Sequence, residues 1–300
     1  MIESIPNVSE GRDLALVAEL ARAVRGTSGA ILLDASADPS HHRSVYTIVG
    51  AADALQRAIL DLTAIAVARI DLRAHRGVHP RIGAVDVVPF VPLDGATMPE
   101  CVHLARSVGA AIAAHFGVPV YLYEEAAVDP MRRRLEHIRQ GGFEGLAERM
   151  HRPEWTPDFG PAAPHPTAGA TVVGARWPLV AFNVNLATGD LAAAKAIARS
   201  VRESSGGLPC VKALGLLLPH RGLAQVSMNL TNYRRTPVRT AFEAVRQAAD
   251  ALGVTVLESE LIGLIPAAAL AGTTPADLLL EGFSPGQVLE TRLAEAIAGR

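Results

Sequence analysis

The chain has 300 residues, of which 49% are hydrophobic and 19% charged, so it can bury one large core or two modest ones. Its formal net charge is −2, and all of its basic residues are arginines except Lys195 and Lys212. The sequence therefore lacks the basic excess that a nucleic-acid or anionic-membrane surface needs, whereas many arginines suit a ligand with several carboxylates. No export signal opens the sequence and no run of eighteen apolar residues occurs, so we expect a cytoplasmic protein.

Hydrophobic periodicity along the first 91 residues predicts the element order βαββαβ. Apolar residues recur at helical spacing from Leu14 to Val24, and two short β-rich runs flank the polar turn ADPSHH. The predicted strands are 2–6, 30–34, 44–49 and 84–91, and the predicted helices are 14–24 and 51–70. The two runs at 30–34 and 44–49 are expected to pair as an antiparallel hairpin.

The second half of the sequence repeats this order, which indicates an internal duplication. Its predicted strands are 179–186, 211–218, 224–230 and 254–257, and its predicted helices are 191–202 and 238–252. Between the repeats, residues 98–177 are expected to add a helix through His115, a strand at 118–123 and a helical stretch over 130–150 to the first half. We therefore expect two domains, residues 1–177 and 178–300.

Each repeat has the order of a split βαβ unit, which predicts an α+β fold. Two helices cover one face of the sheet in such a ferredoxin-like sandwich, and the other face needs a partner. We expect two ferredoxin-like βαββαβ lobes with mixed sheets, stacked around an interlobe crevice.

The stretch AHRGVHPRIGAVD at 74–86 places two histidines and two arginines directly before a predicted buried strand. Polar side chains at a strand entrance commonly face a ligand, and histidine transfers protons near neutral pH. His79 lies between Gly77 and Pro80 and is the candidate for chemistry, whereas the ordinary interpretation of His75 is a solvated residue at a helix end. Arg76 and Arg81 are candidates for binding acidic groups.

Two further polar segments carry candidate residues. The segment DPSHHRSV at 38–45 contains Arg43, where the chain re-enters the sheet. The loop 7–13 is expected to cap the first helix through Ser9 or Glu10. The four histidines at 41, 42, 75 and 79 lack the carboxylate or helical spacing of a zinc site, so we expect no metal. Residues 156–171, rich in proline and glycine, form either a linker or a ligand-binding loop.

With these motifs the sequence resembles the formiminotransferase family, which includes glutamate formiminotransferase and the first domain of formiminotransferase-cyclodeaminase. The resemblance runs through nine segments in order: IPNVSEGR, LLDASADPSHHRSVYTIVG, HRGVHPRIGAVDVVPFVPL, VPVYLYEEAA, WTPDFGP, GATVVGAR, AFNVNL, LAQVSMNL and ELIGLIP. It implies transfer of the formimino group of N-formimino-L-glutamate to tetrahydrofolate as co-substrate, with a ligand tunnel where two α/β lobes meet. The family pattern and the uncovered sheet face together indicate a homodimer.

The resemblance also implies roles for individual residues. The G-x-H-P-R motif places the catalytic histidine at His79. The folate-binding loop follows the D-F-G-P motif, which here gives Gly160, Pro161, Ala162, Ala163, Pro164, His165, Pro166, Thr167, Ala168 and Gly169. Arg43, Arg76 and Arg81 are the candidates for the substrate carboxylates. Mammalian-type enzymes have a second Asp two residues after the first, whereas Asp34 is followed here by Ala35 and Ser36, so Asp38 becomes the candidate to replace it.

Two alternatives to this function remain open from the sequence. One is transfer of a formyl group from N-formylglutamate, since that donor differs from the formimino donor at a single atom. The other is a non-catalytic folate-binding module on the same scaffold. The intact motif around His79 favours an enzyme.

Overall fold

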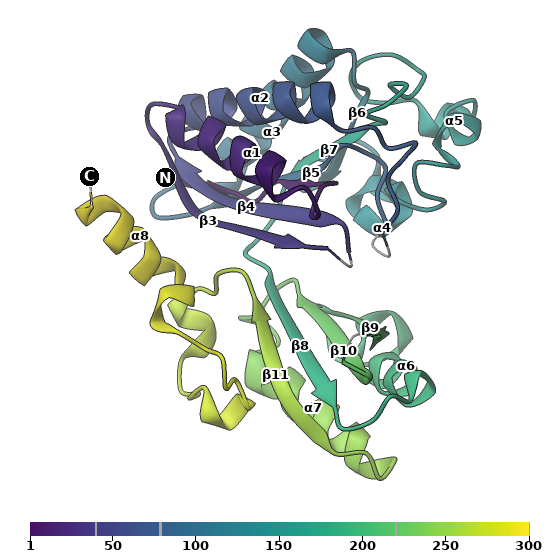
Figure 1. The fold of residues 1–300 in the computed structure, drawn as a ribbon, viewed down its shortest axis with the longest axis vertical. Helices are drawn as coiled ribbons and strands as arrows, with labels where there is room; N and C mark the ends of the chain where they lie inside the picture. Colours follow the sequence, from purple (N-terminus) through teal and green to yellow (C-terminus); the bar gives the residue numbers. More distant parts are fainter. Residues whose placement is uncertain (40, 78–79, 220, 300) are drawn as a thin grey trace. The chain divides into compact units, whose positions relative to one another are not determined.

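Helices and strands follow the order that the hydrophobic periodicity predicts, as the computed structural model in Figure 1 shows. The structure describes residues 1–39, 41–77, 80–219 and 221–299. It divides into two compact units, Met1–Arg176 and Trp177–Arg300. Each unit combines helices with its own sheet, which confirms the predicted α+β class.

The first unit contains a seven-stranded mixed sheet. Its strands are β1 (Ile2–Ser4), β2 (Asn7–Val8), β3 (Ala30–Asp38), β4 (Arg43–Gly50), β5 (Val85–Pro92), β6 (Val120–Glu124) and β7 (Thr171–Ala175). Strands β1 and β2 both lie between β4 and β5, β3 pairs with β4, and these contacts are antiparallel. Strand β6 matches the strand predicted at 118–123, and β7, which was not predicted, lies between β5 and β6 and pairs with both in parallel.

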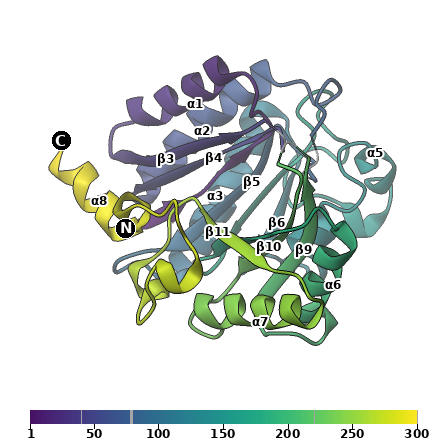
Figure 2. The same cartoon turned by 60° about the horizontal axis from the view of Figure 1, so that its bottom comes forward.

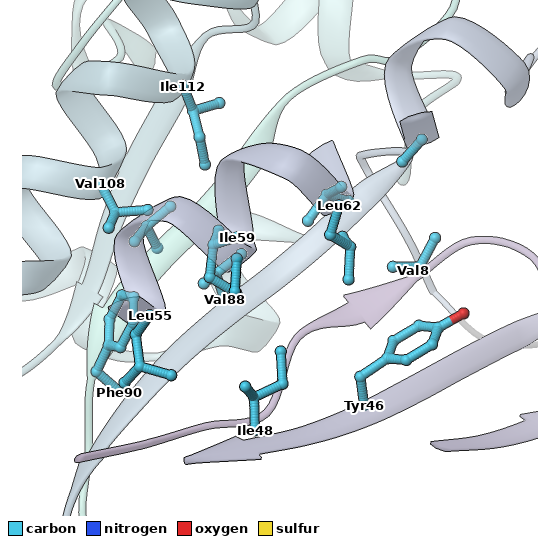
Figure 3. Close-up of a cluster of buried hydrophobic side chains, with 14 of the residues drawn as sticks. Val8, Tyr46, Ile48, Leu55, Ile59, Leu62, Val88, Phe90, Val108 and Ile112 are labelled. Atoms are coloured by element: carbon cyan, nitrogen blue, oxygen red, sulfur yellow. The ribbon is translucent and has the colours of Figure 1, made fainter. Parts of the chain in front are cut away.

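Three long helices cover one face of this sheet, as Figure 1 shows for α1 (Leu14–Gly26), α2 (Ala52–Arg69) and α3 (Met98–Phe116). Their apolar side chains meet those of β4 and β5 in one core, drawn in Figure 3. Tyr46 is fully buried there, and its hydroxyl donates to the carbonyl oxygen of Val17 at 3.2 Å. A buried phenol of this kind needs such a partner, since an unsatisfied hydroxyl in a core is costly.

One face of the β3–β4 hairpin packs against α1 and α2, and the opposite face carries polar side chains of the candidate site. A bulge between Leu32 and Asp34 shifts the register, after which Asp38 lies opposite Arg43. Alternate residues of a strand point to opposite faces, so Arg43 leaves β4 on the side opposite Tyr46. The sequence therefore places a cationic side chain on the face that α1 and α2 do not cover.

The second unit has a four-stranded sheet in the order β11-β8-β10-β9. Its strands are β8 (Val180–Leu186), β9 (Val211–Leu218), β10 (Leu223–Leu230) and β11 (Val256–Ile262), and its longer helices are α6 (Leu191–Val201), α7 (Val238–Ala251) and α8 (Leu289–Ala298). Helices α6 and α7 lie side by side on one face, as Figure 2 shows. This strand order has a counterpart in the first unit, where β5 is followed by β1 and β2 together, then by β4 and then by β3.

Three expectations differ from the structure. The second sheet is wholly antiparallel along its described pairings, so a mixed sheet occurs in the first unit only. The predicted helical stretch 130–150 consists of a 3₁₀ turn and the short helices α4 (Leu135–Ile138) and α5 (Leu146–Arg149). Gly141 and Gly142 separate α4 from α5 and both have positive φ, which interrupts a helix. The last predicted strand begins at Val256 and runs to Ile262, later than expected.

Candidate functional site

Two polar loops of the first unit pack against each other at the end of the β3–β4 hairpin. Gly11 lies so close to the hairpin that a Cβ there would overlap the backbone of Asp38 and Arg43. Arg12 also donates through Nε to the carbonyl oxygen of Pro39 at 2.9 Å. Glycine at position 11 therefore allows the loop 7–13 to reach the turn that carries residues 38–43.

The loop 7–13 does not cap α1 through the residues that the sequence suggested. Asp13 is the cap, since its side chain accepts from two backbone amides of the first helical turn. The carboxylate of Glu10 accepts from the amides of Arg12 and Asp13, and the hydroxyl of Ser9 donates to the carbonyl oxygen of Gly83 at 2.7 Å. Ser9 therefore connects this loop to the segment 74–84.

The rings of His42 and His75 stack with their centroids 4.1 Å apart and their planes 7° from parallel. His42 places one ring nitrogen 3.1 Å from the Glu10 carboxylate and the other 3.1 Å from the carbonyl oxygen of Arg76. Both neighbours are hydrogen-bond acceptors. Burial opposes the charge on Glu10, but its hydrogen bonds with Asp13 and Arg12 and the charge of His42 outweigh burial and lower its pKa.

His75 is buried, which shows that its interpretation as a solvated helix-end residue is wrong. Nε2 of its ring lies 2.8 Å from the carbonyl oxygen of His42, and Nδ1 accepts from Nε of Arg81 at 2.9 Å. This arrangement requires the neutral tautomer with its proton on Nε2. Burial is the main reason that the pKa of His75 is lowered, and the positive charges of His42 and Arg81 act in the same direction.

Arg81 connects the segment 74–81 to the turn after α4. Two of its guanidinium nitrogens donate to the Glu144 carboxylate at 3.0 and 2.8 Å, and its Nε donates to His75. The hydrogen bonds from Arg81 lower the pKa of Glu144 to about 2. Every nitrogen of this guanidinium is therefore already used within the protein.

The other predicted residues of this segment have different surroundings. Arg76 is exposed, and its NH1 donates to the carbonyl oxygens of Arg73 and His75. Gly77 packs so tightly against the hairpin turn that a Cβ would overlap the carbonyl oxygen of His41. His79 lies outside the described residues, so its predicted catalytic role stays a prediction. Gly77 and Arg81 hold the chain on either side of it.

Arg43 lies among charged side chains that the sequence did not bring together. Burial lowers its pKa to about 10, the charge of Arg139 adds to this effect, and those of Asp86 and Asp38 oppose it. Arg139 follows α4, and its NH2 donates to the buried carboxylate of Asp86. The Asp86 carboxylate also accepts from the amides of Ile82 and Gly83, directly after the segment 74–81.

The candidate folate loop 160–169 packs against the same segment through its second half. The amide of Ala84 donates to the carbonyl oxygen of Ala168, and that of Ala170 to the carbonyl oxygen of Ile82, both at 2.9 Å. Gly169 has a φ of 69°, and a Cβ there would overlap the carbonyl oxygen of Ile82. Residues 160–163 are exposed. The second half of the loop is therefore hydrogen-bonded to residues 82–84, which lie between the histidine motif and β5.

The turn 38–43 is held by its own side chains. The Asp38 carboxylate accepts from the backbone amide of His41 and contacts its ring nitrogen Nδ1. An Asp side chain that bonds the backbone of its own turn is common local turn chemistry. Its predicted catalytic alternative, assisting the histidine, stays a prediction.

Throughout residues 1–39, 41–77, 80–219 and 221–299, His, Cys, Asp and Glu side chains nowhere gather in threes as a metal site would require. In the same part of the chain, the helices are all too short or too polar to cross a bilayer.

Both units of the chain match models of one protein family. The N-terminal subdomain of the formiminotransferase domain matches residues 1–176, and the formiminotransferase domain matches residues 181–277. A glutamate formimidoyltransferase of Streptococcus pyogenes is 44% identical over 98% of both chains, and one of Thermoplasma acidophilum is 44% identical over 99% of this chain and 98% of its own. The formimidoyltransferase-cyclodeaminase of Dictyostelium discoideum is 42% identical over 98% of this chain and 56% of its own length. The chain belongs to the formiminotransferase family.

Proposed function

We propose that this chain is a glutamate formimidoyltransferase, which transfers the formimino group of N-formimino-L-glutamate to tetrahydrofolate and gives 5-formiminotetrahydrofolate and L-glutamate. The observation that carries the proposal is the match along nearly the full length of two glutamate formimidoyltransferases. The bifunctional relatives match over about half of their length. The reaction serves one-carbon metabolism and the degradation of histidine.

The reaction needs one group that can move a proton between two nitrogens. N5 of the folate attacks the formimino carbon, and a tetrahedral intermediate forms. A proton then leaves the folate nitrogen, a proton reaches the glutamate nitrogen, and the bond between that nitrogen and the formimino carbon breaks. We assign both proton transfers to His79, because an imidazole accepts and donates protons near neutral pH.

The surroundings of the segment 75–81 support this assignment. Gly77 packs on the turn 38–43, and Arg81 is held by His75 and Glu144. The described residues that flank His79 in the sequence are therefore held by contacts within the protein, which suits a site whose chemistry needs alignment. In this proposal His75 is a positioning residue, because both of its ring nitrogens are occupied and its pKa is lowered.

The folate is assigned to the loop 160–169. Its second half bonds to residues 82–84, directly after the histidine motif, while its first half is exposed. Such a loop has one rigid end and one accessible end, which suits a ligand-binding loop better than a plain linker. Among the arginines, Arg43 and Arg76 are the candidates for a donor carboxylate, whereas Arg81 is already occupied.

The finer features of the fold belong to the same proposal. The common order of four antiparallel strands in the two units supports two ferredoxin-like lobes. Their stacking around a crevice that holds the ligands stays a prediction, as do the homodimer and the cytoplasmic location.

A direct assay tests the function. Purified protein is incubated with tetrahydrofolate and either N-formimino-L-glutamate or N-formylglutamate, and the folate product is followed by absorbance. The proposal expects turnover with the formimino donor at a much higher kcat/KM than with the formyl donor. A higher kcat/KM with the formyl donor would make the chain a formyltransferase. Folate binding without turnover of either donor would make it a binding module.

A further inference from the structure

Ser9 joins the loop 7–13 to the residues that follow the segment 75–81. Its backbone amide donates to the carbonyl oxygen of Ala84 at 2.8 Å, and its hydroxyl donates to the carbonyl oxygen of Gly83 at 2.7 Å. Ser9 is buried, so water does not compete for these two hydrogen bonds. The loop is therefore fixed directly before strand β5, just beyond the C-terminal end of the segment.

Glu10, the next residue of the loop, reaches the opposite end of this segment through His42. Oε1 of Glu10 lies 3.1 Å from Nε2 of His42, and Nδ1 of the same ring lies 3.1 Å from the carbonyl oxygen of Arg76. The side chains of His42 and Glu10 are only 13% and 14% exposed. Hydrogen bonds are stronger where water is largely excluded. The ring of His42 therefore connects the carboxylate of Glu10 to the backbone of Arg76.

Further contacts join His42 to the start of the same segment. Its ring stacks on that of His75 with the centroids 4.1 Å apart, and its carbonyl oxygen lies 2.8 Å from Nε2 of His75. Gly77 packs so closely that a Cβ there would lie 2.9 Å from the Cβ of His42. His42 has a φ of 53°, which a residue with a side chain adopts rarely and keeps where its surroundings hold it. His42 therefore contacts three successive residues, His75, Arg76 and Gly77.

We propose that Glu10 and His42 are positioning residues of the transfer reaction. The carboxylate of Glu10 orients the ring of His42, and that ring holds residues 75–77, which precede His79 in the chain. The inference rests on the proposed function, and it gives a role to a loop that was expected only to cap α1, a helix that Asp13 caps instead. A group that must accept and return a proton depends on its alignment, so loosening the residues before it lowers turnover more than it weakens substrate binding.

The first variant removes the ring of His42 and keeps its backbone conformation. Asn tolerates a positive φ, but it is too short to stack on His75 and to reach both Glu10 and Arg76, so His42→Asn loses these contacts together. His151→Asn is the control, because His151 is exposed in the turn after α5. Melting temperatures establish that both variants fold.

Two variants of Glu10 separate its contact with His42 from its size. Glu10→Ala removes the acceptor of the ring. Glu10→Gln keeps Oε1, the atom that lies near His42 and also accepts from the amides of Arg12 and Asp13. Gln should therefore recover most of the turnover that is lost in Glu10→Ala. If Gln recovers none of it, the hydrogen bond to the ring is not what positions the segment.

Steady-state kinetics with both substrates varied gives the main result. His42→Asn should lower kcat about tenfold and leave both KM values within about threefold, as expected for the loss of a hydrogen bond that acts on alignment. Glu10→Ala combined with His42→Asn should cost no more than about twofold beyond His42→Asn alone, because Glu10 acts through His42. Additive losses, a raised KM with a normal kcat, or an equal loss in His151→Asn overturn the inference.

Amide hydrogen exchange followed by mass spectrometry tests the same inference without a substrate. Exchange over residues 74–84 should be at least about tenfold faster in His42→Asn than in the wild type, while exchange over α3 stays the same. Unchanged exchange over 74–84, or an equal increase over α3, overturns the inference. Failure of the proposed function gives a different result, because the wild-type protein would then transfer nothing. The exchange rates still decide in that case whether Glu10 and His42 hold the segment.

Discussion

Replacing Arg81 by glutamine should lower turnover and leave the KM for formiminoglutamate within about threefold, because this guanidinium holds the catalytic segment instead of the substrate. Its three nitrogens donate to His75 and Glu144. Glutamine removes the two bonds to Glu144 and the bond to the buried ring of His75. A residue that acts by positioning changes kcat more than KM.

The size of the effect follows from these partners. Glu144 is 64% exposed, so its ion pair with Arg81 contributes at most about 1 kcal/mol. The buried Nδ1 of His75 loses its donor, which costs about 1–3 kcal/mol. A total loss of about 2 kcal/mol shifts the ordering of this segment about thirtyfold, which is the largest fall in turnover that positioning explains. Glu144→Gln removes only the exposed pair and should cost no more than about fivefold.

Steady-state kinetics with both substrates varied measures these effects, and Arg81→Lys provides the control. Lysine keeps the charge but cannot donate to Glu144 and His75 at the same time, so it should not restore turnover. A raised donor KM with normal turnover in Arg81→Gln, partly restored in Arg81→Lys, would refute the positioning role. Arg81 would then bind the substrate carboxylate, as the sequence alone suggested.

Three further predictions concern individual side chains of the same unit. His79→Gln should lose at least about a hundredfold in turnover with an unchanged melting temperature, because glutamine cannot carry a proton; near-normal turnover would rule out the catalytic role. Folding stability should fall as the pH decreases below about 6.5, since the unfolded chain protonates His75 while the folded chain, with its lowered pKa, does not; denaturant titrations of His75→Gln should show a weaker pH dependence. Gly169→Ala should lower the melting temperature clearly more than Gly206→Ala, because both glycines have positive φ but only Gly169 would overlap the carbonyl oxygen of Ile82.

Most of the fold could be predicted because apolar residues recur at a clear period in its helices and strands, and because the residues that cap its helices lie next to them in the sequence. Helix α1 has Leu16, Leu20 and Val24 on its buried face, and α6 begins at the cap Asp190. Strand β7 was missed because its five residues are all buried and therefore do not alternate. The helical stretch over 130–150 was overpredicted because the conformations of Gly141 and Gly142 depend on the chain around them.

The candidate site could also be predicted only in part. The segments 7–13, 38–45 and 74–81 could be found from the sequence, since each is a short polar run beside a buried strand. The loop 160–169 was identified from the family resemblance, within a stretch rich in proline and glycine. The partners of these segments could not be found, because Arg139 and Glu144 lie 53 and 63 positions from Asp86 and Arg81, in a stretch that was expected to be helical. The burial of His75 was missed for the same reason, since its neighbour His42 is 33 positions away.

The two hairpins of the common strand order each carry an arginine, and these two arginines have different surroundings. Arg221 precedes β10 as Arg43 begins β4, so the two arginines occupy related places in the two repeats. Arg221 contacts the carboxylates of Glu258 and Glu260 on β11, at 2.6 and 3.3 Å, and its positive charge is therefore met within its own unit. Burial lowers the pKa of Arg43 to about 10, the charge of Arg139 adds to this effect, and the charges of Asp86 and Asp38 oppose it. The two hairpins therefore differ in the burial and the charges around one arginine, which is why Arg43 and not Arg221 stays the candidate for a substrate carboxylate.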